Sequence, residues 1–530
     1  MQPKSTKLHY PLFFSALFLL LLILEKCFTL SLHHPGEVIP SSIFILCFLF
    51  FITKIKLRIT ACIFFVYLAF IYFSQNLGLA IYGYWTPPYY IVLFFENMSE
   101  AIASTQNGIK PLLYAAGFSL VVLSVYFLAY RKSRSSRKHI VFDLIFILLI
   151  TYKPISLLVT DTSSNHGELL SKRYTTIKAG HYATNYLFGK LIPHQFFPKT
   201  YYEEYTHSEY PVAPDHKVKN VILILGESLS ATHVPALGYD KNTTPWLSQM
   251  AAHPRFLIKS TYAAGTFTNV ALPMLLNMVP TPNADKHIMS HKTNLFSMAK
   301  MNGYHTYFHS AQAQDEMSLV AKLGLENIDR YTDATLLGYS RKHSALDHEL
   351  VPLIGHIDFN QSNFLVLHQR GSHAPYTARV PQGYAPFGTK TYVQQYDNSI
   401  RYTDEFWQQV FDEINHRMPD DDWLLIYTSD HGQTVTENTI SQGSLEKPGD
   451  YMVPTFIYSP SPQLQQFYEA ALSHCQRLFH VQVATLLGHS LGYEIPIADC
   501  KFGVVTGGKI DGSHGFMEIT ATPDTTESDV

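Results

Sequence analysis

Five long apolar stretches in the first third of the chain constrain its fold more than any other feature. A helix needs roughly 20 apolar residues to cross the hydrocarbon core of a membrane. In this 530-residue chain the first, fourth and fifth stretches are clear spans, and the second and third are short but compatible with spans. The sequence therefore predicts a transmembrane domain at residues 1–160 with a loop at residues 75–109 and spans at residues 10–30, 40–53, 59–74, 111–130 and 139–160.

Basic residues in the short loops predict the orientation of these spans. Lys4 and Lys7 precede the first span, Lys54 begins a basic cluster after the second, and the run Arg131–Lys138 follows the fourth. Short loops rich in Lys and Arg remain in the cytoplasm. Because the number of spans is odd, the rest of the chain lies on the opposite side. We therefore expect a multi-pass protein of a bacterial cell inner membrane whose polar part is in the periplasm.

The polar part of the chain has the pattern of an α/β domain. Short β-branched runs alternate with longer segments of helical spacing, which indicates an α/β sandwich around a largely parallel sheet. Residues 161–220 lack a clean period and are expected to bridge the two parts on the membrane surface. The predicted domain follows at residues 221–518, and residues 519–530 are expected to be a disordered tail. The strand-like runs lie at residues 221–225, 304–309, 364–368, 423–427 and 453–458.

Charge, composition and cysteine content limit the partners of the chain and the environment of its two parts. A formal net charge of -3 leaves no broad basic surface, so we expect no nucleic-acid partner. Apolar residues make up 47% and charged residues 15% of the chain, as in a membrane part joined to a soluble part. Cys475 and Cys500 lie in the polar part, where they are compatible with one disulfide or with two buried thiols.

Polar residues of a catalytic kind follow several of the predicted strands. In open α/β sheets the reacting groups gather beyond the carboxyl ends of the strands. Glu227 comes after the first run, and Asp430 and His431 come after the fourth. Two carboxylates and an imidazole suit zinc, with one position left for a reacting oxygen. The hydroxyl of Thr268 is a candidate for that position, where it would attack a phosphodiester and pass the phosphoryl group to a second alcohol.

Each of these residues also has a plainer interpretation. A glutamate after a strand is usually a cap or a surface carboxylate, and Thr268 is by default the N-cap of the helix that follows it. The adjacent pair Asp430 and His431 is harder to explain in this way, because two metal-type ligands at a chain reversal are uncommon. Their joint occurrence in one domain favours a metal site.

The order of these motifs resembles that of the phosphoethanolamine transferases. This family includes the lipid A modifying and mobile colistin-resistance enzymes and belongs to the alkaline phosphatase and sulfatase superfamily. The resemblance covers essentially the whole chain and implies a five-helix transmembrane domain followed by a periplasmic alkaline-phosphatase-like α/β sandwich. The motifs that carry it are Gly226–Ser228, Gly238–Tyr239 with Asn242–Pro245, Gly265–Thr268 with Pro273, His368–Gln369 with Gly371 and His373, and Ser429–Gly432.

The resemblance implies the chemistry of the site and its substrates. It implies Zn2+ bound by Glu227, Thr268, Asp430 and His431, with Thr268 as the nucleophile that forms a phospho-threonine. Phosphatidylethanolamine would be the donor, and a glycan or glycolipid of the cell envelope would be the acceptor.

The resemblance also implies residues that bind the substrate. His373 matches a family histidine near a second metal or the substrate. Asn97 and Glu100 lie in a periplasmic loop segment that resembles one reaching the active site, so Glu100 is a candidate partner for the ethanolamine ammonium. The alternative for Glu100 is a solvated loop carboxylate.

The chain departs from the family pattern at several positions. Ala264 and Met274 replace a cysteine pair that flanks the nucleophile, Glu96 replaces a threonine, and Gln433 and Gln442 stand in a region linked to a second metal. These departures leave the acceptor open among lipid A, a core sugar, a Kdo residue and a periplasmic glucan. Two alternatives remain, a glycerophosphate transferase on the same fold and a catalytically inactive homologue that binds an envelope partner. Sulfatase chemistry needs Cys or Ser followed by x-Pro-x-Arg, a string that the sequence lacks.

Overall fold

Two structural units divide the chain, residues 1–163 with 168–199 and residues 164–167 with 200–530. The computed structural model describes residues 9–28, 38–82, 85–86, 91, 110–133, 138–159, 176–196, 202–314, 320–341, 343–418, 422–438, 440–512 and 515–520.

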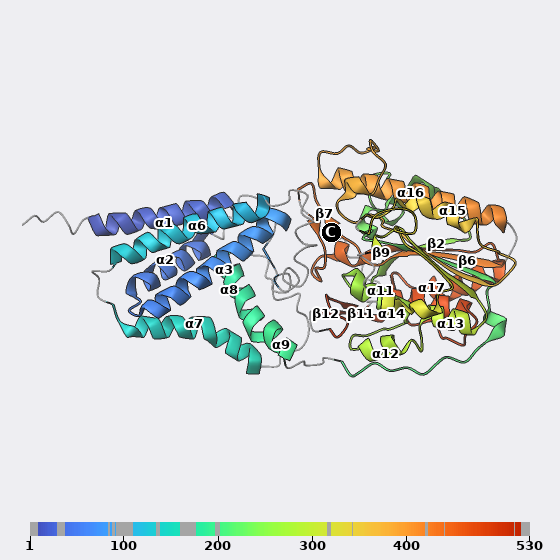
Figure 1. Cartoon of the computed structure of the whole chain (residues 1–530), viewed down its shortest axis with the longest axis horizontal. Coiled ribbons are helices and arrows are strands. Elements are labelled where there is room, and N and C mark those ends of the chain that lie inside the picture. The colour runs from blue at the N-terminus through green and yellow to red at the C-terminus, as the bar shows by residue number, and fades with distance from the viewer. Residues whose placement is uncertain are drawn as a thin grey trace, which may run out of the picture. The chain divides into compact units, whose positions relative to one another are not determined.

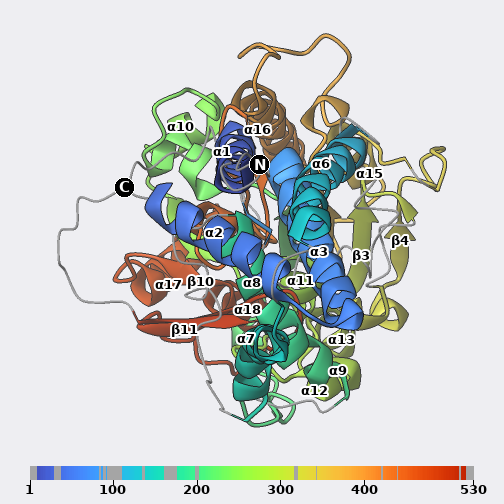
Figure 2. The ribbon, with the colours of Figure 1, turned by 90° about the vertical axis from the view of Figure 1, so that its left-hand side faces the viewer.

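The N-terminal unit is helical at all five apolar stretches. Helices α3 and α6 pack along each other, and both α1 and α2 also contact α6 (Figures 1 and 2). Their side chains form one apolar cluster, to which α7 contributes Phe146. The five helices are α1 (His9–Phe28), α2 (Val38–Lys54), α3 (Arg58–Tyr82), α6 (Lys110–Lys132) and α7 (Ile140–Val159).

Three of these helices, within the residues that the structure describes, are long and apolar enough to cross a membrane. They cover Arg58–Ala80, Lys110–Lys132 and Ile140–Val159. The apolar cores of the first two stretches are shorter helices, Leu12–Glu25 and Ser42–Lys54. The structure therefore supports three candidate spans, and the count of five membrane helices remains a prediction.

Helix α3 is longer than the third apolar stretch of the sequence. The polar residues Gln75 and Asn76 interrupt the apolar pattern, yet both are fully buried within the helix. The side-chain amide of Gln75 accepts from the backbone N–H of Thr86 at 3.0 Å and donates to the Thr86 carbonyl at 3.3 Å. Because the amide of Gln75 is paired inside the protein, the helix continues through this polar position to Tyr82.

A further helical segment follows in the same unit. Helix α8 (Thr176–Tyr186) continues as a short π-helix (Leu187–Leu191) and then as α9 (Ile192–Phe196). The buried carboxylate of Glu25 accepts the backbone N–H of Thr176 at 2.7 Å, which pairs one of the free N–H groups at the start of α8. Helix α8 packs against α3 and α7. The location of residues 161–220 on the membrane surface remains a prediction.

The C-terminal unit is built on an eight-stranded sheet with the order β10-β2-β9-β6-β1-β5-β3-β4. Among the described strands of this sheet, β9 alone runs antiparallel to its neighbours. Strand β1 is buried on both faces, which explains why its sequence is a continuous apolar run. The strands are β1 (Asn220–Gly226), β2 (Phe256–Tyr262), β3 (His305–Ser310), β4 (Arg330–Thr332), β5 (Asn363–His368), β6 (Trp423–Ser429), β9 (Met452–Tyr458) and β10 (Leu478–Phe479).

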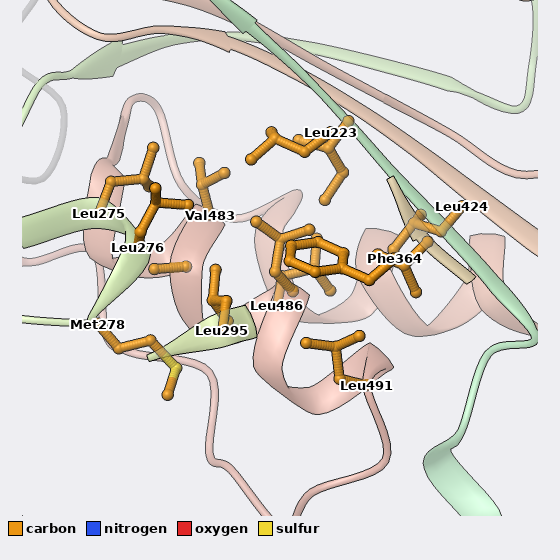
Figure 3. Packing of buried hydrophobic residues seen from close by; sticks show 14 of the residues in the cluster. Leu223, Leu275, Leu276, Met278, Leu295, Phe364, Leu424, Val483, Leu486 and Leu491 are labelled. Atoms are coloured by element: carbon orange, nitrogen blue, oxygen red, sulfur yellow. The ribbon is translucent and has the colours of Figure 1, made fainter. Parts of the chain in front are cut away.

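Helices cover both faces of this sheet, so the expected α/β sandwich is confirmed. One face packs Leu223 and Phe364 against α11, α13 and α18, where Leu275, Val483 and Leu486 fill the core (Figure 3). The other face packs against α10, α15 and α16. The helices of this unit are α10 (Pro245–Met250), α11 (Thr268–Leu276), α12 (Asp285–Ser290), α13 (Leu295–Met301), α14 (Val320–Leu323), α15 (Val351–Ile354), α16 (Tyr392–Arg417), α17 (Pro462–Leu472) and α18 (His480–Ser490).

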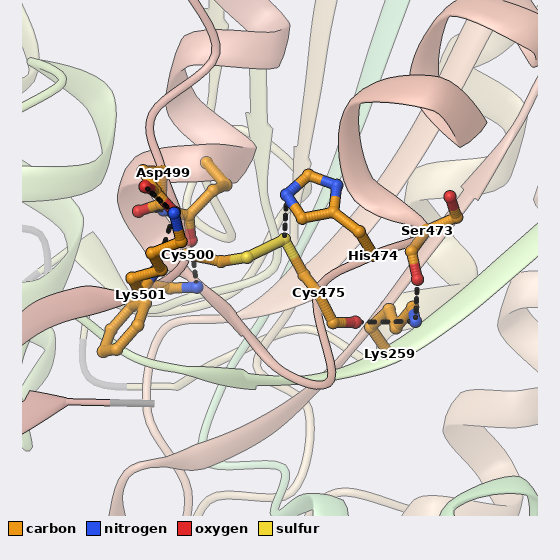
Figure 4. The surroundings of a disulfide bond; sticks show 9 residues. Lys259, Ser473, His474, Cys475, Asp499, Cys500 and Lys501 are labelled. Carbon is orange, nitrogen blue, oxygen red and sulfur yellow. Dashed lines mark hydrogen bonds and ion pairs between the residues drawn. A yellow bond between two sulfur atoms is a disulfide. The ribbon is translucent and has the colours of Figure 1, made fainter. Parts of the chain in front are cut away.

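Two small hairpins and a disulfide complete the C-terminal unit. Strand β7 (Thr434–Val435) pairs with β8 (Ile440–Ser441), and β11 (Phe502–Thr506) pairs with β12 (Phe516–Thr520). Cys475 and Cys500 are joined in a disulfide, which decides between the two states that the sequence left open (Figure 4). Lys259 donates to the backbone carbonyl of Cys475 at 2.7 Å and so ties the disulfide to β2.

Candidate functional site

The carboxyl ends of β1 and β6 bring three metal-type ligands together. These strands are parallel neighbours, with Gly226 opposite Ser429, so the residues that follow them leave the sheet side by side. Glu227 follows β1, and Asp430 and His431 follow β6. One ligand atom of each lies within 4.8 Å of the others, and all three side chains are buried.

Backbone contacts orient the imidazole of His431 toward this cluster. Its Nδ1 lies 2.9 Å from the carbonyl oxygen of Gly432, which makes Nδ1 the N–H donor and leaves a lone pair on Nε2. Nε2 lies 3.5 Å from Oε1 of Glu227 and 3.4 Å from Oδ2 of Asp430. Burial alone would lower the pKa of His431. The negative charges of Asp430 and Glu227 have the larger combined effect, so the pKa of His431 is raised above its usual value. The cluster is therefore a place where positive charge is stabilised.

Asp430 shows that the cluster fits a cation. Its Oδ1 accepts the backbone N–H groups of Ser228 at 3.0 Å and of His431 at 2.7 Å. Its Oδ2 is buried and has no hydrogen-bond partner among the described residues. A buried carboxylate oxygen without a donor is costly unless a cation meets it. Two carboxylates and one imidazole are a donor set that suits zinc.

Thr268 points its hydroxyl into this cluster and does not cap the helix that it begins. The N-cap of α11 is Phe267, and no side chain there makes a capping hydrogen bond. The Thr268 hydroxyl donates to Oε2 of Glu227 at 3.3 Å, and its oxygen also lies 3.3 Å from Nε2 of His431. The N-cap interpretation of Thr268 is therefore wrong, because its hydroxyl lies between two of the ligand side chains.

Glu227 is held by Ser228 of its own motif and by Gln312, a residue that the sequence patterns did not identify. Its Oε1 accepts from the Ser228 hydroxyl at 2.7 Å, and its Oε2 accepts from the side-chain amide of Gln312 at 2.9 Å. The same amide nitrogen lies 3.1 Å from Nε2 of His368. Burial lowers the pKa of His368 to about 4, so this imidazole is neutral. Gln312 lies just after strand β3. A search for polar residues beyond the carboxyl end of that strand would therefore have identified it.

The segment after β5 is fastened to the backbone of Glu227. Ser372 donates its N–H to the Glu227 carbonyl at 3.0 Å, and this places His373 on a segment that runs beside the cluster. Gly371 has a φ of 50°, and a Cβ there would lie 2.8 Å from the same carbonyl oxygen, so the chain requires glycine. The carboxylate of Asp347 accepts the N–H groups of Arg370 at 2.7 Å and of Gly371 at 3.1 Å.

The turn after Glu227 is also held by α16, which packs on the face of the sheet opposite α11. Tyr396 of α16 donates its hydroxyl hydrogen to the Ser228 carbonyl at 2.7 Å and accepts the N–H of Ser230 at 2.9 Å. Ser228 has a φ of 60°, a conformation that a non-glycine residue adopts only where its surroundings support it. Asn97 and Glu100, the other residues expected to bind substrate, lie outside the described residues.

Comparison with known proteins identifies relatives in the same family that the sequence motifs resemble. The family model described as Sulfatase matches residues 219–490. The chain is 25% identical over 311 residues to the Kdo(2)-lipid A phosphoethanolamine 7''-transferase of Salmonella typhimurium, which covers 52% of this chain and 52% of that protein. It is 24% identical over 247 residues to the phosphatidylethanolamine transferase Mcr-1 of Escherichia coli, with 43% and 45% covered. The chain therefore spans about half the length of the curated relatives it matches.

A solved structure matches the fold over most of the chain. The integral membrane lipooligosaccharide phosphoethanolamine transferase A (EptA) of Neisseria meningitidis superposes with a TM-score of 0.56 and 18% sequence identity. The match covers 90% of this chain and 95% of that protein. The resemblance expected from the motifs is thus confirmed, and the fold is shared.

Proposed function

This chain belongs to the Sulfatase family, and from that premise we propose that it transfers phosphoethanolamine from phosphatidylethanolamine to a glycan or glycolipid acceptor of the bacterial cell envelope. The names of its relatives support the reaction, since they are transferases of phosphoethanolamine. The observation that carries the proposal is the hydroxyl of Thr268, which lies 3.3 Å both from Oε2 of Glu227 and from Nε2 of His431.

Glu227, Asp430 and His431 would hold zinc, with the oxygen of Thr268 in the remaining position. Zinc bound there supplies positive charge that stabilises an oxyanion. The protein contributes the geometry: Gln312 and Ser228 fix the Glu227 carboxylate, and the Gly432 carbonyl fixes the ring of His431. Because these groups are buried and hydrogen-bonded, they need little rearrangement when the site reacts.

Thr268 acts as the nucleophile in a double displacement. Its oxygen bonds to the phosphorus of the donor as the bond from phosphorus to the diacylglycerol oxygen breaks. The threonine loses its hydroxyl proton, and diacylglycerol leaves as an alcohol that gains one. An acceptor hydroxyl then attacks the phospho-threonine, and Thr268 regains its proton. We assign donor binding to Asn97 and Glu100, which would meet the ethanolamine ammonium, and to His373.

The proposed reaction requires a membrane location. We propose a multi-pass inner-membrane protein with five spans at residues 1–160 and its catalytic domain in the periplasm. The basic residues of the short loops support this orientation. A reporter active only in the periplasm should be on when fused at the C-terminus and off when fused after Arg134. The reverse pattern excludes a periplasmic acceptor.

The covalent step is tested by isolating the phospho-threonine. Full-length enzyme incubated with phosphatidylethanolamine, without acceptor, should yield a phosphoethanolamine adduct on the peptide that contains Thr268, detected by mass spectrometry. Thr268→Ala should abolish both the adduct and transfer. Thr268→Ser keeps the hydroxyl and should retain part of the activity, and Thr266→Ala should retain most of it. Substantial transfer by Thr268→Ala contradicts the covalent mechanism.

The acceptor is identified by a separate measurement. Mass spectrometry of the lipid A, core, Kdo and periplasmic glucan fractions, from cells with and without the gene, should show one phosphoethanolamine gained on a single fraction. A gain of glycerophosphate in place of phosphoethanolamine would instead support the alternative donor, phosphatidylglycerol.

A further inference from the structure

We propose that the imidazole of His480 positions Thr268 by holding the segment before Thr268 against the segment before Asp430. This fixes where the Thr268 hydroxyl lies within the ligand cluster of Glu227, Asp430 and His431. The inference rests on the proposed function, because it concerns the residue that acts as the nucleophile there. It makes His480 a positioning residue, which acts through two backbone contacts and not through the metal or the substrate.

The strands alone do not join the two segments directly. Strand β2 leads to Thr268 and β6 leads to Asp430, but β9 lies between these strands in the sheet. Strand β9 runs antiparallel to both, so it begins at the end of the sheet where β2 and β6 stop. A contact that fixes the nucleophile segment directly against the ligand segment must therefore pass over β9.

His480 lies where it can make this contact. Strand β10 pairs in parallel with β2, with Phe479 opposite Tyr262, so His480 leaves the sheet at the same end as the nucleophile segment. Its Nδ1 lies 3.1 Å from the backbone nitrogen of Ala264, and its Nε2 lies 3.0 Å from the carbonyl oxygen of Ser429. Because the Ala264 N–H can only donate, Nδ1 accepts, and Nε2 carries the hydrogen that it donates to Ser429. One buried ring therefore bridges the two segments.

The ligand end of this bridge is itself anchored. Ser429 directly precedes Asp430, and its hydroxyl donates to the carbonyl oxygen of His431 at 3.0 Å. The same hydroxyl oxygen accepts the N–H of Leu229, beyond the end of β1, at 2.9 Å. His480 thus contacts the ligand segment at a residue whose place is fixed from two further sides.

The nucleophile end of the bridge is held from the opposite side by strand β11. The carbonyl oxygen of Ala264 accepts the N–H of Thr506 at 2.8 Å, and the N–H of Thr266 donates to the carbonyl oxygen of Thr506 at 3.0 Å. If the imidazole of His480 were absent, the buried N–H of Ala264 would lose its acceptor, which is costly. The segment would shift to pair this N–H, and Thr268 would move with it.

Helix α18 holds the His480 ring in place. The helix begins at His480, and its residues Val483 and Leu486 pack in the same core cluster as Leu275 of α11 (Figure 3). Helix α11 begins at Thr268. The packing of these two helices and the two hydrogen bonds of the ring therefore fix the bridge before a metal or a substrate binds.

A thiol in place of the Thr268 hydroxyl reports the position of this residue without turnover. Full-length Thr268→Cys, saturated with cobalt(II), should show a thiolate-to-cobalt charge-transfer band that the chain with threonine lacks, because thiolates bind such metals. In this background, His480→Gln keeps a donor for Ser429 and removes the acceptor for Ala264. His480→Asn keeps an acceptor for Ala264 and removes the donor for Ser429.

Both His480 variants should lower the charge-transfer band to less than about half, because each breaks one end of the bridge and leaves a buried group unpaired. The visible bands of cobalt should show that the metal stays bound. Val483→Ala is the matched control, since it removes buried methyl groups from the same helix. It should lower the melting temperature and leave the band unchanged.

Each outcome of this experiment decides the assignment. A full band in either His480 variant, a weakened band in Val483→Ala, loss of bound cobalt in the His480 variants, or no band in Thr268→Cys alone would each overturn it. A weakened band in both His480 variants, with Val483→Ala unchanged, would support it even if the wild type transferred no phosphoethanolamine. In that case the proposed function would fail, and the positioning role of His480 would stand.

Discussion

Gln312 donates its side-chain amide to Oε2 of Glu227 at 2.9 Å, and so links the end of β3 to the residue that follows β1. The two strands are not neighbours, since β5 lies between them. The same amide donates to the carbonyl of Gln369 at 3.2 Å, just beyond the end of β5. One side chain therefore spans three strand ends and sets the position of a candidate metal ligand.

Replacing Gln312 should weaken metal binding without removing a ligand. Partners that orient metal ligands typically contribute 10–100-fold to metal affinity, so we expect Gln312→Ala to raise the zinc Kd by about that factor. Competition with a chromogenic chelator measures the change. Gln409→Ala, on the exposed side of α16, is the matched control. A zinc Kd equal to that of the wild type would show that Glu227 does not need this contact.

Removing a ligand side chain should have a larger effect. Asp430→Ala and Asp430→Asn should each weaken zinc binding by more than about 100-fold. This loss is larger than the one expected for Gln312→Ala, because Gln312 only orients a ligand. Asp430→Asn keeps an oxygen for the N–H groups of Ser228 and His431, so its melting temperature should fall less than that of Asp430→Ala. Asp412→Asn, exposed on α16, controls for the change of charge. Full zinc occupancy in both Asp430 variants would mean that the metal lies elsewhere.

His348 should make the C-terminal unit sensitive to acid. Its ring stacks on Tyr402 at 4.0 Å, and its two ring nitrogens are buried without a hydrogen-bond partner in the described part of the chain. Burial lowers the pKa of His348 to about 4. As the pH falls from 6.5 toward 4, the unfolded chain takes up a proton that the folded chain does not, so the free energy of unfolding decreases.

The substitution His348→Phe tests this sensitivity. Phenylalanine keeps the stacking surface and removes both the unpaired nitrogens and the titrating group. The melting temperature of the variant should fall less than that of the wild type between pH 6.5 and pH 4. His416→Phe, at an exposed position of α16, controls for the added apolar side chain. Parallel pH profiles for His348→Phe and the wild type would assign the acid sensitivity to other groups.

The disulfide should stabilise the C-terminal unit without affecting the metal cluster. Cys475 and Cys500 are 25 residues apart, and closing a loop of this length contributes about 3 kcal/mol by the loss of chain entropy in the unfolded state. The double variant Cys475→Ala/Cys500→Ala should melt at a lower temperature and bind zinc like the wild type. Cys47→Ala/Cys62→Ala, which removes two exposed free thiols of the described residues, should melt like the wild type. Equal melting temperatures for the two double variants would show that the bond adds no stability.

The central strands were predictable because they are buried on both faces. Each of the five apolar runs corresponds to a strand, β1, β3, β5, β6 or β9, within two residues. Strand β2 was missed because Lys259, Ser260 and Thr261 interrupt its apolar pattern and its middle is only half-buried. The antiparallel direction of β9 was also not predictable, because an apolar run has the same pattern in either direction.

The candidate site was predictable only in part, for a geometric reason. Glu227, Asp430 and His431 follow neighbouring parallel strands, so knowledge of the strand ends is enough to bring them together. The contact between Gln433 and Gln442 depends instead on the path of the loop around β7 and β8, which no periodic pattern describes. For the same reason, the residues alone gave Thr268 only as a candidate for the open position, and the resemblance implied its role as the nucleophile.

The position of β1 in the middle of the sheet affects how the chain folds while it is being synthesised. The N–H of Ser228 and Oδ1 of Asp430, which form a hydrogen bond beside the cluster, are 202 residues apart in sequence. At a synthesis rate of about 5–20 residues per second, β1 waits roughly 10 to 40 s for β6 to emerge. Until then the edge of β1 that pairs with β6 is open and prone to aggregate, and sheets with such distant pairings fold slowly. We therefore expect chains that end before residue 423 to be retained by chaperones or degraded, because without β6 one edge of β1 has no neighbouring strand.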